Sequence, residues 1–227
     1  MIEQIQTIDS GYAIRQQCLS ETECDTILNA LSRDTIARSR AGARHLMANP
    51  IVSRLSTDDR LAAIARDMLG TNALPFRATL FEKSGETNWL IPWHQDTALP
   101  LAEAFDAPGW GPWSRKAGTA YAHAPSWALS RIVALRVHLD ASTADNGPLR
   151  IVPGSHRMGV LGDHDVTELA SKRDHVSCLV SRGGVLAMRP LLIHSSSKAH
   201  TADPRRVLHI EYADTLDLGP GIRLAVV

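Results

Sequence analysis

Two histidines and an aspartate are the residues of this sequence whose types and spacing best suit metal chemistry. His94 and Asp96 form a His-x-Asp pair, and His194 lies 98 residues later (194 − 96). Imidazole and carboxylate groups suit Fe(II), and three protein ligands on one face of the ion leave positions open for a co-substrate and O2. Residues i and i+2 of a strand point to the same side, so a His-x-Asp pair where a strand runs into a turn can reach one ion.

The third ligand and the group that would hold a co-substrate must come from other segments. His194 ends the apolar run 191–193, which predicts a short buried strand. Arg205 follows at a spacing of eleven (205 − 194) and could pair with the carboxylate of an organic acid. A His-x-Asp pair alone is weak evidence in a chain with ten histidines. Together with the later histidine and the arginine, it predicts a metal site.

Three segments of alternating polar and apolar residues would position these side chains. They span residues 76–83, 131–140 and 205–212. In an ordinary half-buried sheet the polar rows face water. In a barrel that encloses a cofactor, the apolar rows meet flanking helices and the polar rows line the cavity. We favour the second arrangement for Arg136 and Arg205, and we leave both open for His138, His209 and Glu211.

The same alternation separates two neighbouring arginines. Leu208, Ile210 and Tyr212 form the apolar row of the last segment and should pack against helices. Neighbouring residues of a strand point to opposite faces. We therefore expect Arg205, and not Arg206, to enter the cavity.

The N-terminal third predicts one strand and two helices. Residues 12–15 suit a strand, and Ser20 with Glu23 forms a capping box that starts a helix. A second helix should begin near Ser56 or Thr57 and end at Gly70. The apolar stripes of these helices indicate packing on the outside of the barrel.

Six segments resemble, in their order and spacing, the phytanoyl-CoA dioxygenase family. They are RATLFEK (77–83), PWHQDT (92–97), DNGPL (145–149), PGSH (153–156), RPLLIHSS (189–196) and PRRVLHIEY (204–212). The resemblance runs from about residue 10 to 215. It implies a mostly β fold with flanking helices: a double-stranded β-helix (jelly-roll, cupin-like) core with the N-terminal helices packed outside, in a single domain over residues 1–227.

The resemblance also implies an activity. Members of the family bind Fe(II) and 2-oxoglutarate, use O2, and mostly hydroxylate carbon with release of succinate and CO2. The expected reaction is hydroxylation, or desaturation, of a small-molecule metabolite. Carried over by position, His94, Asp96 and His194 resemble the iron ligands, Arg205 the 2-oxoglutarate clamp and Ser196 its helper. The other candidates for cofactor binding are Arg77, Thr79 and Arg136.

Three alternative functions are to be weighed against a hydroxylase. Halogenases of the same fold replace the carboxylate ligand with a small residue, and the presence of Asp96 argues against that class. A jelly-roll that only binds a small ligand would not turn 2-oxoglutarate over to succinate. A cupin-like zinc or manganese enzyme would not use 2-oxoglutarate at all.

Residues 99–127 form the longest stretch without a periodic pattern, and they follow the His-x-Asp pair directly. Long loops in compact domains are often functional, so we expect a lid over the active site, seated by Trp110 and Trp113. The alternative is a surface loop anchored by the same tryptophans. Ser155 lacks the G-x-S-x-G context of a nucleophile, and we expect a structural role for it and for His156.

Composition limits the partners. The chain has 24 Lys and Arg residues and 24 Asp and Glu residues, without a basic cluster that would indicate nucleic acid. It shows neither a secretion signal nor an apolar run of membrane-spanning length. Three cysteines without metal-type spacing predict reduced thiols in a cytoplasmic protein.

We expect a monomer or homodimer. Substrate identity stays open, because Lys83, Arg115, Lys116 and Arg136 could hold an anionic group or simply be solvated or structural.

Overall fold

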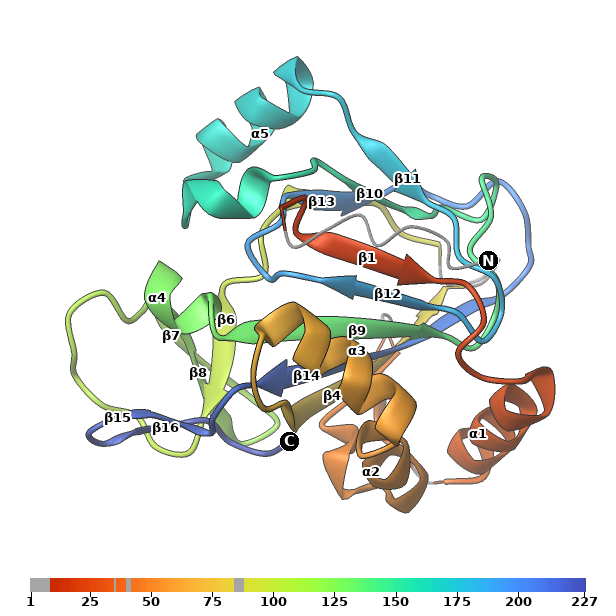
Figure 1. The fold of residues 1–227 in the computed structure, drawn as a ribbon, viewed down its shortest axis with the longest axis horizontal. Helices are drawn as coiled ribbons and strands as arrows, with labels where there is room; N and C mark the ends of the chain where they lie inside the picture. Colours follow the sequence, from red (N-terminus) through yellow and green to blue (C-terminus); the bar gives the residue numbers. More distant parts are fainter. Residues whose placement is uncertain (1–8, 35, 40–41, 84–87) are drawn as a thin grey trace.

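The computed structural model describes residues 9–34, 36–39, 42–83 and 88–227. Its centre is a double-stranded β-helix made of two antiparallel sheets (Figure 1). The larger sheet has the order β1 (Tyr12–Arg15), β12 (Val185–Met188), β9 (Ile132–His138), β14 (Arg205–Ala213), β4 (Leu74–Lys83), β3 (Gly42–Arg44) and β2 (Arg38–Ser39). The smaller has the order β11 (Val176–Cys178), β10 (Leu149–Ile151), β13 (His194–Ser196) and β5 (Ile91–His94).

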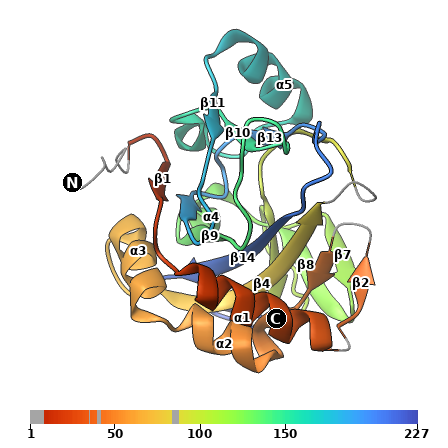
Figure 2. The same ribbon diagram turned by 90° about the vertical axis from the view of Figure 1, so that its right-hand side faces the viewer.

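Two small sheets stand beside the barrel. One has the order β6 (Ala98–Leu101), β8 (Thr119–His123) and β7 (Trp113–Lys116), and the other pairs β15 (Asp217–Gly219) with β16 (Ile222–Arg223). The helices are α1 (Glu21–Arg33), α2 (Pro50–Ser56), α3 (Asp59–Leu69), α4 (Ser126–Leu129) and α5 (Asp163–Lys172), with 3₁₀ turns at Leu46–Ala48 and Ser155–Met158. Figure 2 shows α1, α2 and α3 together on one face of the larger sheet. No helix in the described parts of the chain is long and apolar enough to cross a membrane.

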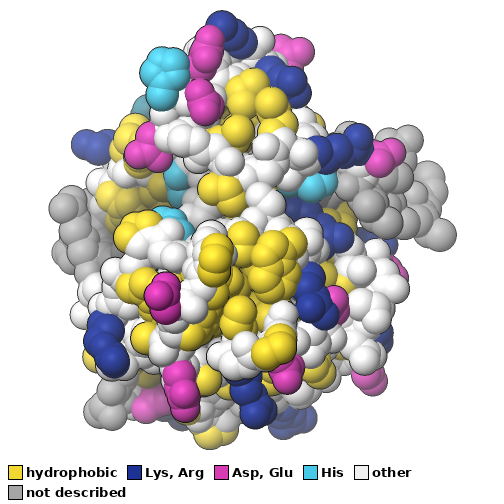
Figure 3. Space-filling view, turned by 90° about the vertical axis from the view of Figure 1, so that its left-hand side faces the viewer, with side chains coloured by type: hydrophobic (Ala, Val, Ile, Leu, Met, Phe, Trp, Pro, Cys, Tyr) yellow, Lys and Arg dark blue, Asp and Glu magenta, His cyan; other side chains and the backbone are white. Residues whose placement is uncertain are grey.

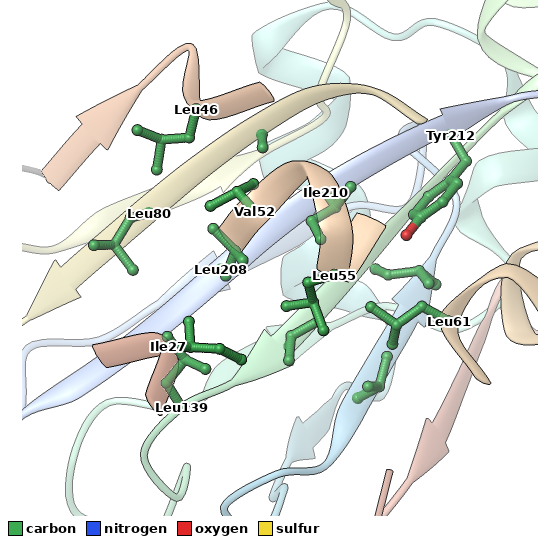
Figure 4. Close-up of a cluster of buried hydrophobic side chains, with 14 of the residues drawn as sticks. Ile27, Leu46, Val52, Leu55, Leu61, Leu80, Leu139, Leu208, Ile210 and Tyr212 are labelled. Carbon is green, nitrogen blue, oxygen red and sulfur yellow. The ribbon is translucent and has the colours of Figure 1, made fainter. Parts of the chain in front are cut away.

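The main core lies between that sheet face and the three helices. The apolar rows predicted for β4, β9 and β14 meet helix side chains there (Figure 4). Leu80, Leu208 and Ile210 are at most 1 % exposed, and the Tyr212 hydroxyl donates a hydrogen bond of 3.0 Å to the Ser56 carbonyl. Burying one such aliphatic side chain contributes about 1.5–3 kcal/mol. This core fixes the strand register that turns the opposite rows toward the interior of the barrel.

The predicted N-terminal elements are confirmed, with one correction. β1 covers the predicted strand, and Ser20 and Glu23 form the capping box of α1. The helix that ends at Gly70 is capped by Asp58 rather than by Ser56 or Thr57, because those residues close the separate helix α2. Asparagine, aspartate, serine and threonine all cap helices, so the sequence offered several starts within a few residues.

Two other segments differ from expectation. Residues 191–193 are buried, but they form a turn, and the strand begins at His194. Residues 99–127 are only partly irregular: about half belong to β6, β7, β8 and the start of α4, and residues 102–112 form a loop without helix or strand. Leu99 and Leu101 are nearly inaccessible to solvent and belong to a second hydrophobic cluster, which also contains Phe76, Ile132 and Ala213 from the larger sheet.

Candidate metal centre and co-substrate pocket

The structure brings His94, Asp96 and His194 together at one end of a cavity between the two sheets. His94 is the last residue of β5 and pairs across the sheet with His194, the first residue of β13. The Nε2 atoms of His94 and His194 lie 3.8 and 3.5 Å from the two carboxylate oxygens of Asp96. Pairing between strands therefore joins residues that are about one hundred positions apart in the sequence.

Both imidazoles are oriented by backbone carbonyls two residues earlier in the chain. Nδ1 of His94 is 2.9 Å from the Pro92 oxygen, and Nδ1 of His194 is 2.8 Å from the Leu192 oxygen. A proton on each Nδ1 leaves the lone pair of each Nε2 directed at Asp96. Outer hydrogen bonds of this kind fix the tautomer and ring orientation of metal-ligating histidines.

Gln95 anchors the short segment that carries His94 and Asp96. Its amide nitrogen donates to the carbonyls of Gly159 (2.9 Å) and Leu191 (2.7 Å), and its amide oxygen accepts from the Leu161 backbone (2.9 Å). The Asp96 backbone nitrogen donates to the Pro190 carbonyl at 2.9 Å. The segment is thereby tied to the turn that precedes His194.

Burial and nearby charges favour, in His194 and Asp96, the protonation states that a metal needs. Burial lowers the pKa of His194 to about 4, so this imidazole is neutral at pH 7. Burial alone would raise the pKa of Asp96, but His194, His209, His94 and Arg77 outweigh it and hold that pKa below its usual range. Metal binding requires neutral imidazole and ionised carboxylate, and the directions of these two pKa shifts favour those states.

The donor set fits a first-row divalent ion. The candidate ligand atoms all lie within 4.8 Å of one another. Metal–ligand bonds of about 2.0–2.2 Å allow two ligands of one ion to stand up to about 4.4 Å apart, and the histidine–Asp96 distances of 3.8 and 3.5 Å meet this limit. A second group of possible ligands in the described chain, His164, Asp165 and Glu168, lies exposed on α5.

A strongly cationic end of the same cavity surrounds Arg205. Arg205 is 6 % exposed and donates to the Asn146 carbonyl (3.2 Å) and the Ser196 hydroxyl (3.3 Å). Burial, then the charge of Arg136, lowers its pKa to about 10, which leaves it protonated at neutral pH. Among the described residues no carboxylate pairs with Arg205 or Arg136, and a buried unpaired guanidinium is costly. An anionic ligand would relieve that cost.

Lys83 adds a third cation to this end. Its ammonium group donates to the Ser196 hydroxyl (3.2 Å) and the Ser197 carbonyl (2.5 Å). Burial, then the charge of Arg205, lowers its pKa to about 8. The predicted Asn146-Gly147 turn closes the pocket beside it. Gly147 has φ +70°, and a Cβ there would lie 2.4 Å from the Ser197 oxygen, so only glycine fits.

The register predicted for the two neighbouring arginines is confirmed. Arg205 faces the cavity, while Arg206 forms a forked pair with Asp140, at 2.7 and 2.8 Å, on the other side of β14. Asp140, which the alternation placed in the row of Arg136, lies beyond the end of β9 and outside that row.

Arg77, His209 and Glu211 form a buried network along the wall next to the metal triad. The Arg77 guanidinium pairs with the Glu211 carboxylate and donates to the Ala98 carbonyl at 2.9 Å. Nδ1 of His209 lies 3.2 Å from the Arg136 guanidinium, and its Nε2 lies 3.4 Å from Glu211. Arg77 is therefore neutralised within the protein, in contrast to Arg205. Thr79, between Arg77 and Phe81 on β4, also lines the cavity.

One protein-family model matches most of the chain, including these residues. The model of the family described as phytanoyl-CoA dioxygenase (PhyH) matches residues 9–207. The chain belongs to this family. Five of the six segments that suggested it lie within the matched range, and the sixth, 204–212, overlaps its end.

Two curated relatives are similar at low identity. Ectoine dioxygenase from Sphingopyxis alaskensis is 26 % identical over 186 residues, which cover 72 % of this chain and 54 % of the relative. L-proline trans-4-hydroxylase from Streptomyces griseoviridis is 25 % identical over 188 residues, covering 71 % and 62 %. This PhyH chain thus matches little more than half to three-fifths of the length of these relatives.

Solved structures share the fold. The crystal structure of EctD from S. alaskensis with bound Fe has a TM-score of 0.67 at 24 % identity, over 90 % of this chain and 73 % of that one. The carbocyclase SnoK from nogalamycin biosynthesis, described as non-haem and α-ketoglutarate-dependent, has a TM-score of 0.68 at 15 % identity, over 95 % and 89 %. These likenesses support the jelly-roll fold of this PhyH member.

All eight candidate site residues of the sequence lie in one cavity of about 340 Å3. They are His94, Asp96, His194, Arg205, Ser196, Arg77, Thr79 and Arg136. Of the three residues left open, His209 lines the cavity and Glu211 pairs with Arg77 behind it. His138 is buried near Arg136 and Arg205 without lining the cavity.

Sequence reasoning missed several lining residues. Tyr121 and His123 come from β8, where alternation over residues 119–123 was the available signal. Neighbouring glycines and prolines, which indicate loops, concealed this alternation. Trp89 and Arg44 also line the cavity, and no pattern in the sequence marks them. Ser155 is structural: its hydroxyl joins the Val152 carbonyl to the Ile193 amide.

Proposed function

We propose that this PhyH protein is an Fe(II)- and 2-oxoglutarate-dependent dioxygenase that hydroxylates a small metabolite. The observation that carries the proposal is the shared cavity. One end holds two Nε2 atoms and a carboxylate within reach of a single ion, and another end holds the buried, carboxylate-free Arg205. A 2-oxo acid needs this pair of features, because one end chelates the metal while the far carboxylate requires a cation.

In this proposal His94, Asp96 and His194 hold Fe(II). Arg205 binds the far carboxylate of 2-oxoglutarate, and the Ser196 hydroxyl and Lys83 support it. When bound, Fe(II), 2-oxoglutarate and O2 supply the oxidising chemistry: one oxygen atom enters the substrate and the other enters succinate, with loss of CO2. The protein contributes position and a cavity poor in water.

Other residues of the cavity have supporting roles. Arg136 stacks over Phe81, with its guanidinium carbon 5.3 Å from the ring centroid, and raises the positive potential near Arg205. Arg77 and Thr79 extend from β4 and line the cavity wall that β4 forms. Since Asp96 occupies the ligand position that a halide would need, the site favours hydroxylation or desaturation over halogenation.

A small substrate agrees with the volume of the cavity and with the size of the compounds for which the relatives are named. The cavity lies near the lower limit of roughly 300–1,000 Å3 for ligand pockets, and co-substrate and substrate must share it. The two curated relatives are named for ectoine and L-proline, both small metabolites. We propose a substrate of comparable size, and we propose residues 99–127 as the segment that covers it.

Turnover of 2-oxoglutarate tests the proposal. Purified protein with Fe(II), 2-oxoglutarate and ascorbate in air should form succinate slowly alone and faster with a true substrate from a metabolite panel. Asp96→Ala and His194→Ala should abolish both rates, whereas His164→Ala, in the exposed group near α5, should change neither. Metal-independent succinate formation, or none under any condition, would contradict the proposal.

A further inference from the structure

The mouth of the cavity carries a second cationic group, separate from the one around Arg205. Arg44 from β3 and Lys116 from β7 both line the cavity. In the described chain, neither forms an ion pair or a hydrogen bond with a carboxylate. Arg44 is exposed and Lys116 half-buried, so both remain accessible to a ligand that enters from solvent.

The two cationic groups lie apart along strand β4. Arg44 is the cross-strand neighbour of Thr79, and Arg205 is the neighbour of Lys83. Thr79 and Lys83 are four residues apart (83 − 79), which corresponds to roughly 13 Å at about 3.3 Å per residue. One small dicarboxylate held at Arg205 cannot also neutralise Arg44 and Lys116.

Tyr121 forms the base of this second group. It is 2 % exposed, and its hydroxyl lies 2.8 Å from Nε2 of His45, whose ring stacks on it. The Lys116 ammonium stands 4.6 Å from the centre of the Tyr121 ring. Arg77 approaches the same ring at 5.8 Å, but Glu211 already neutralises it.

The turn between β7 and β8 fixes where Lys116 emerges. Ala117 and Gly118 have φ values of +46° and +85°, the two positive values that a tight type I′ hairpin turn requires. A non-glycine residue at positive φ is uncommon. The turn holds Lys116 opposite Thr119 in the last pair of the hairpin.

The charge balance of the whole cavity is positive. Six of the described lining residues are cations, and Asp96 is the one carboxylate among them. With Arg77 paired to Glu211 and a 2-oxoglutarate dianion at Arg205, the mouth keeps an uncompensated positive potential. Clefts of this kind concentrate ligands of the opposite charge.

From this geometry we infer that Arg44 and Lys116 bind a carboxylate of the primary substrate and direct its reacting carbon toward the metal triad. This inference rests on the proposed function, because the metal end is what gives the substrate its orientation. It narrows the substrate class to small organic acids, amino acids included.

Calorimetry with matched acid and amide pairs tests the inference. The protein is loaded with Fe(II) and saturated with 2-oxoglutarate without oxygen. It is then titrated with a panel of small metabolic acids and their primary amides, with L-proline and L-prolinamide as one pair. At least one acid should bind ten times or more tightly than its amide. Arg44→Gln and Lys116→Gln should reduce that preference to threefold or less.

Arg66→Gln is the control. It removes one positive charge from an exposed position of α3 that does not line the cavity. It should keep the full preference. The Kd for 2-oxoglutarate, measured on all variants, reports whether each is folded and whether the loss is local to the mouth.

No acid preference anywhere in the panel, or a preference that survives both substitutions, overturns the inference. Succinate formation, measured separately, keeps the two proposals distinct. Succinate without an acid preference leaves the proposed function and rejects this inference. An acid preference without succinate supports a carboxylate site at Arg44 and Lys116 and rejects the proposed function.

Discussion

Arg205 and Arg206 are adjacent in the sequence, yet their guanidinium groups lie in opposite environments. Arg206 has a forked partner in Asp140 and is half-buried. Arg205 is buried with only a carbonyl and a hydroxyl as acceptors. At the residue scale, function therefore depends less on residue type than on which face of β14 the residue occupies.

Arg205→Ala should raise the KM for 2-oxoglutarate at least tenfold. Loss of a charged hydrogen-bonded partner costs about 1.5–3 kcal/mol, and tenfold corresponds to about 1.4 kcal/mol. Arg206→Ala is the neighbouring control and should leave that KM within twofold while lowering thermal stability slightly. Steady-state kinetics of both variants measures this, and the reverse pattern would mean that our strand register is wrong.

We predict that Lys83 makes 2-oxoglutarate binding dependent on pH. Its pKa is lowered to about 8, so the amine is charged below that pH and neutral above it. Arg205, with a pKa of about 10, stays charged across this window. We expect kcat/KM for 2-oxoglutarate to fall as pH rises through about 8, because this parameter reports the free enzyme. Lys83→Met should lower kcat/KM and remove the fall near pH 8; an unchanged profile would exclude a role for Lys83.

At the scale of elements, most of the correct predictions came from the alternation of polar and apolar residues along strands. Apart from Asp140, the polar and apolar rows of β4, β9 and β14 were predicted correctly, because helices bury one face and the cavity buries the other. Short elements were not predictable. Helix α2 begins with Pro50, and β7 and β8 are joined by Ala117-Gly118, so their local signals resemble loops. Their conformation depends on contacts with distant residues.

Leu208→Ala should destabilise the fold without touching the site. Leu208 is fully buried on the helix side of β14, and a Leu-to-Ala change in a core costs about 2–5 kcal/mol. Chemical denaturation should show this loss, and the KM for 2-oxoglutarate at low temperature should stay within twofold. A large KM change with unchanged stability would place this residue on the cavity side instead.

Aromatic side chains pack against one another within residues 99–127, the proposed lid. Phe105 packs edge to face against Trp110 and Trp113, and Trp110 also contacts Trp127. Figure 3 shows a broad hydrophobic surface on the side of the molecule that carries these strands. Neither Trp110 nor Trp113 lines the cavity. They would act by holding the hairpin that carries Lys116, Tyr121 and His123.

Replacing Trp110 and Trp113 together with alanine should leave 2-oxoglutarate binding intact. It should uncouple 2-oxoglutarate consumption from substrate oxidation, because a loosened hairpin admits water. The ratio of succinate to oxidised substrate measures the coupling. A ratio that stays at one in the double variant would show that the segment is not a lid.

At the scale of the whole molecule, two sheets assemble a site from residues spread over half the chain. The sequence predicted eight residues that line one cavity, because each lies next to a recognisable turn or in an alternating row. It could not give their distances, since these depend on the pairing of β5 with β13 and of β14 with β4. The second cationic group depends on β3 and β7, both of which are too short to show a pattern.

A crystal structure of the protein grown without oxygen with Fe(II) and 2-oxoglutarate tests the central claim most directly. Anomalous scattering at the iron edge should show one ion bound by His94, Asp96 and His194, at about 2.0–2.2 Å from each ligand atom. The far carboxylate of 2-oxoglutarate should lie within hydrogen-bond distance of Arg205 and Ser196. Iron elsewhere in the chain, or 2-oxoglutarate held away from Arg205, would contradict the account.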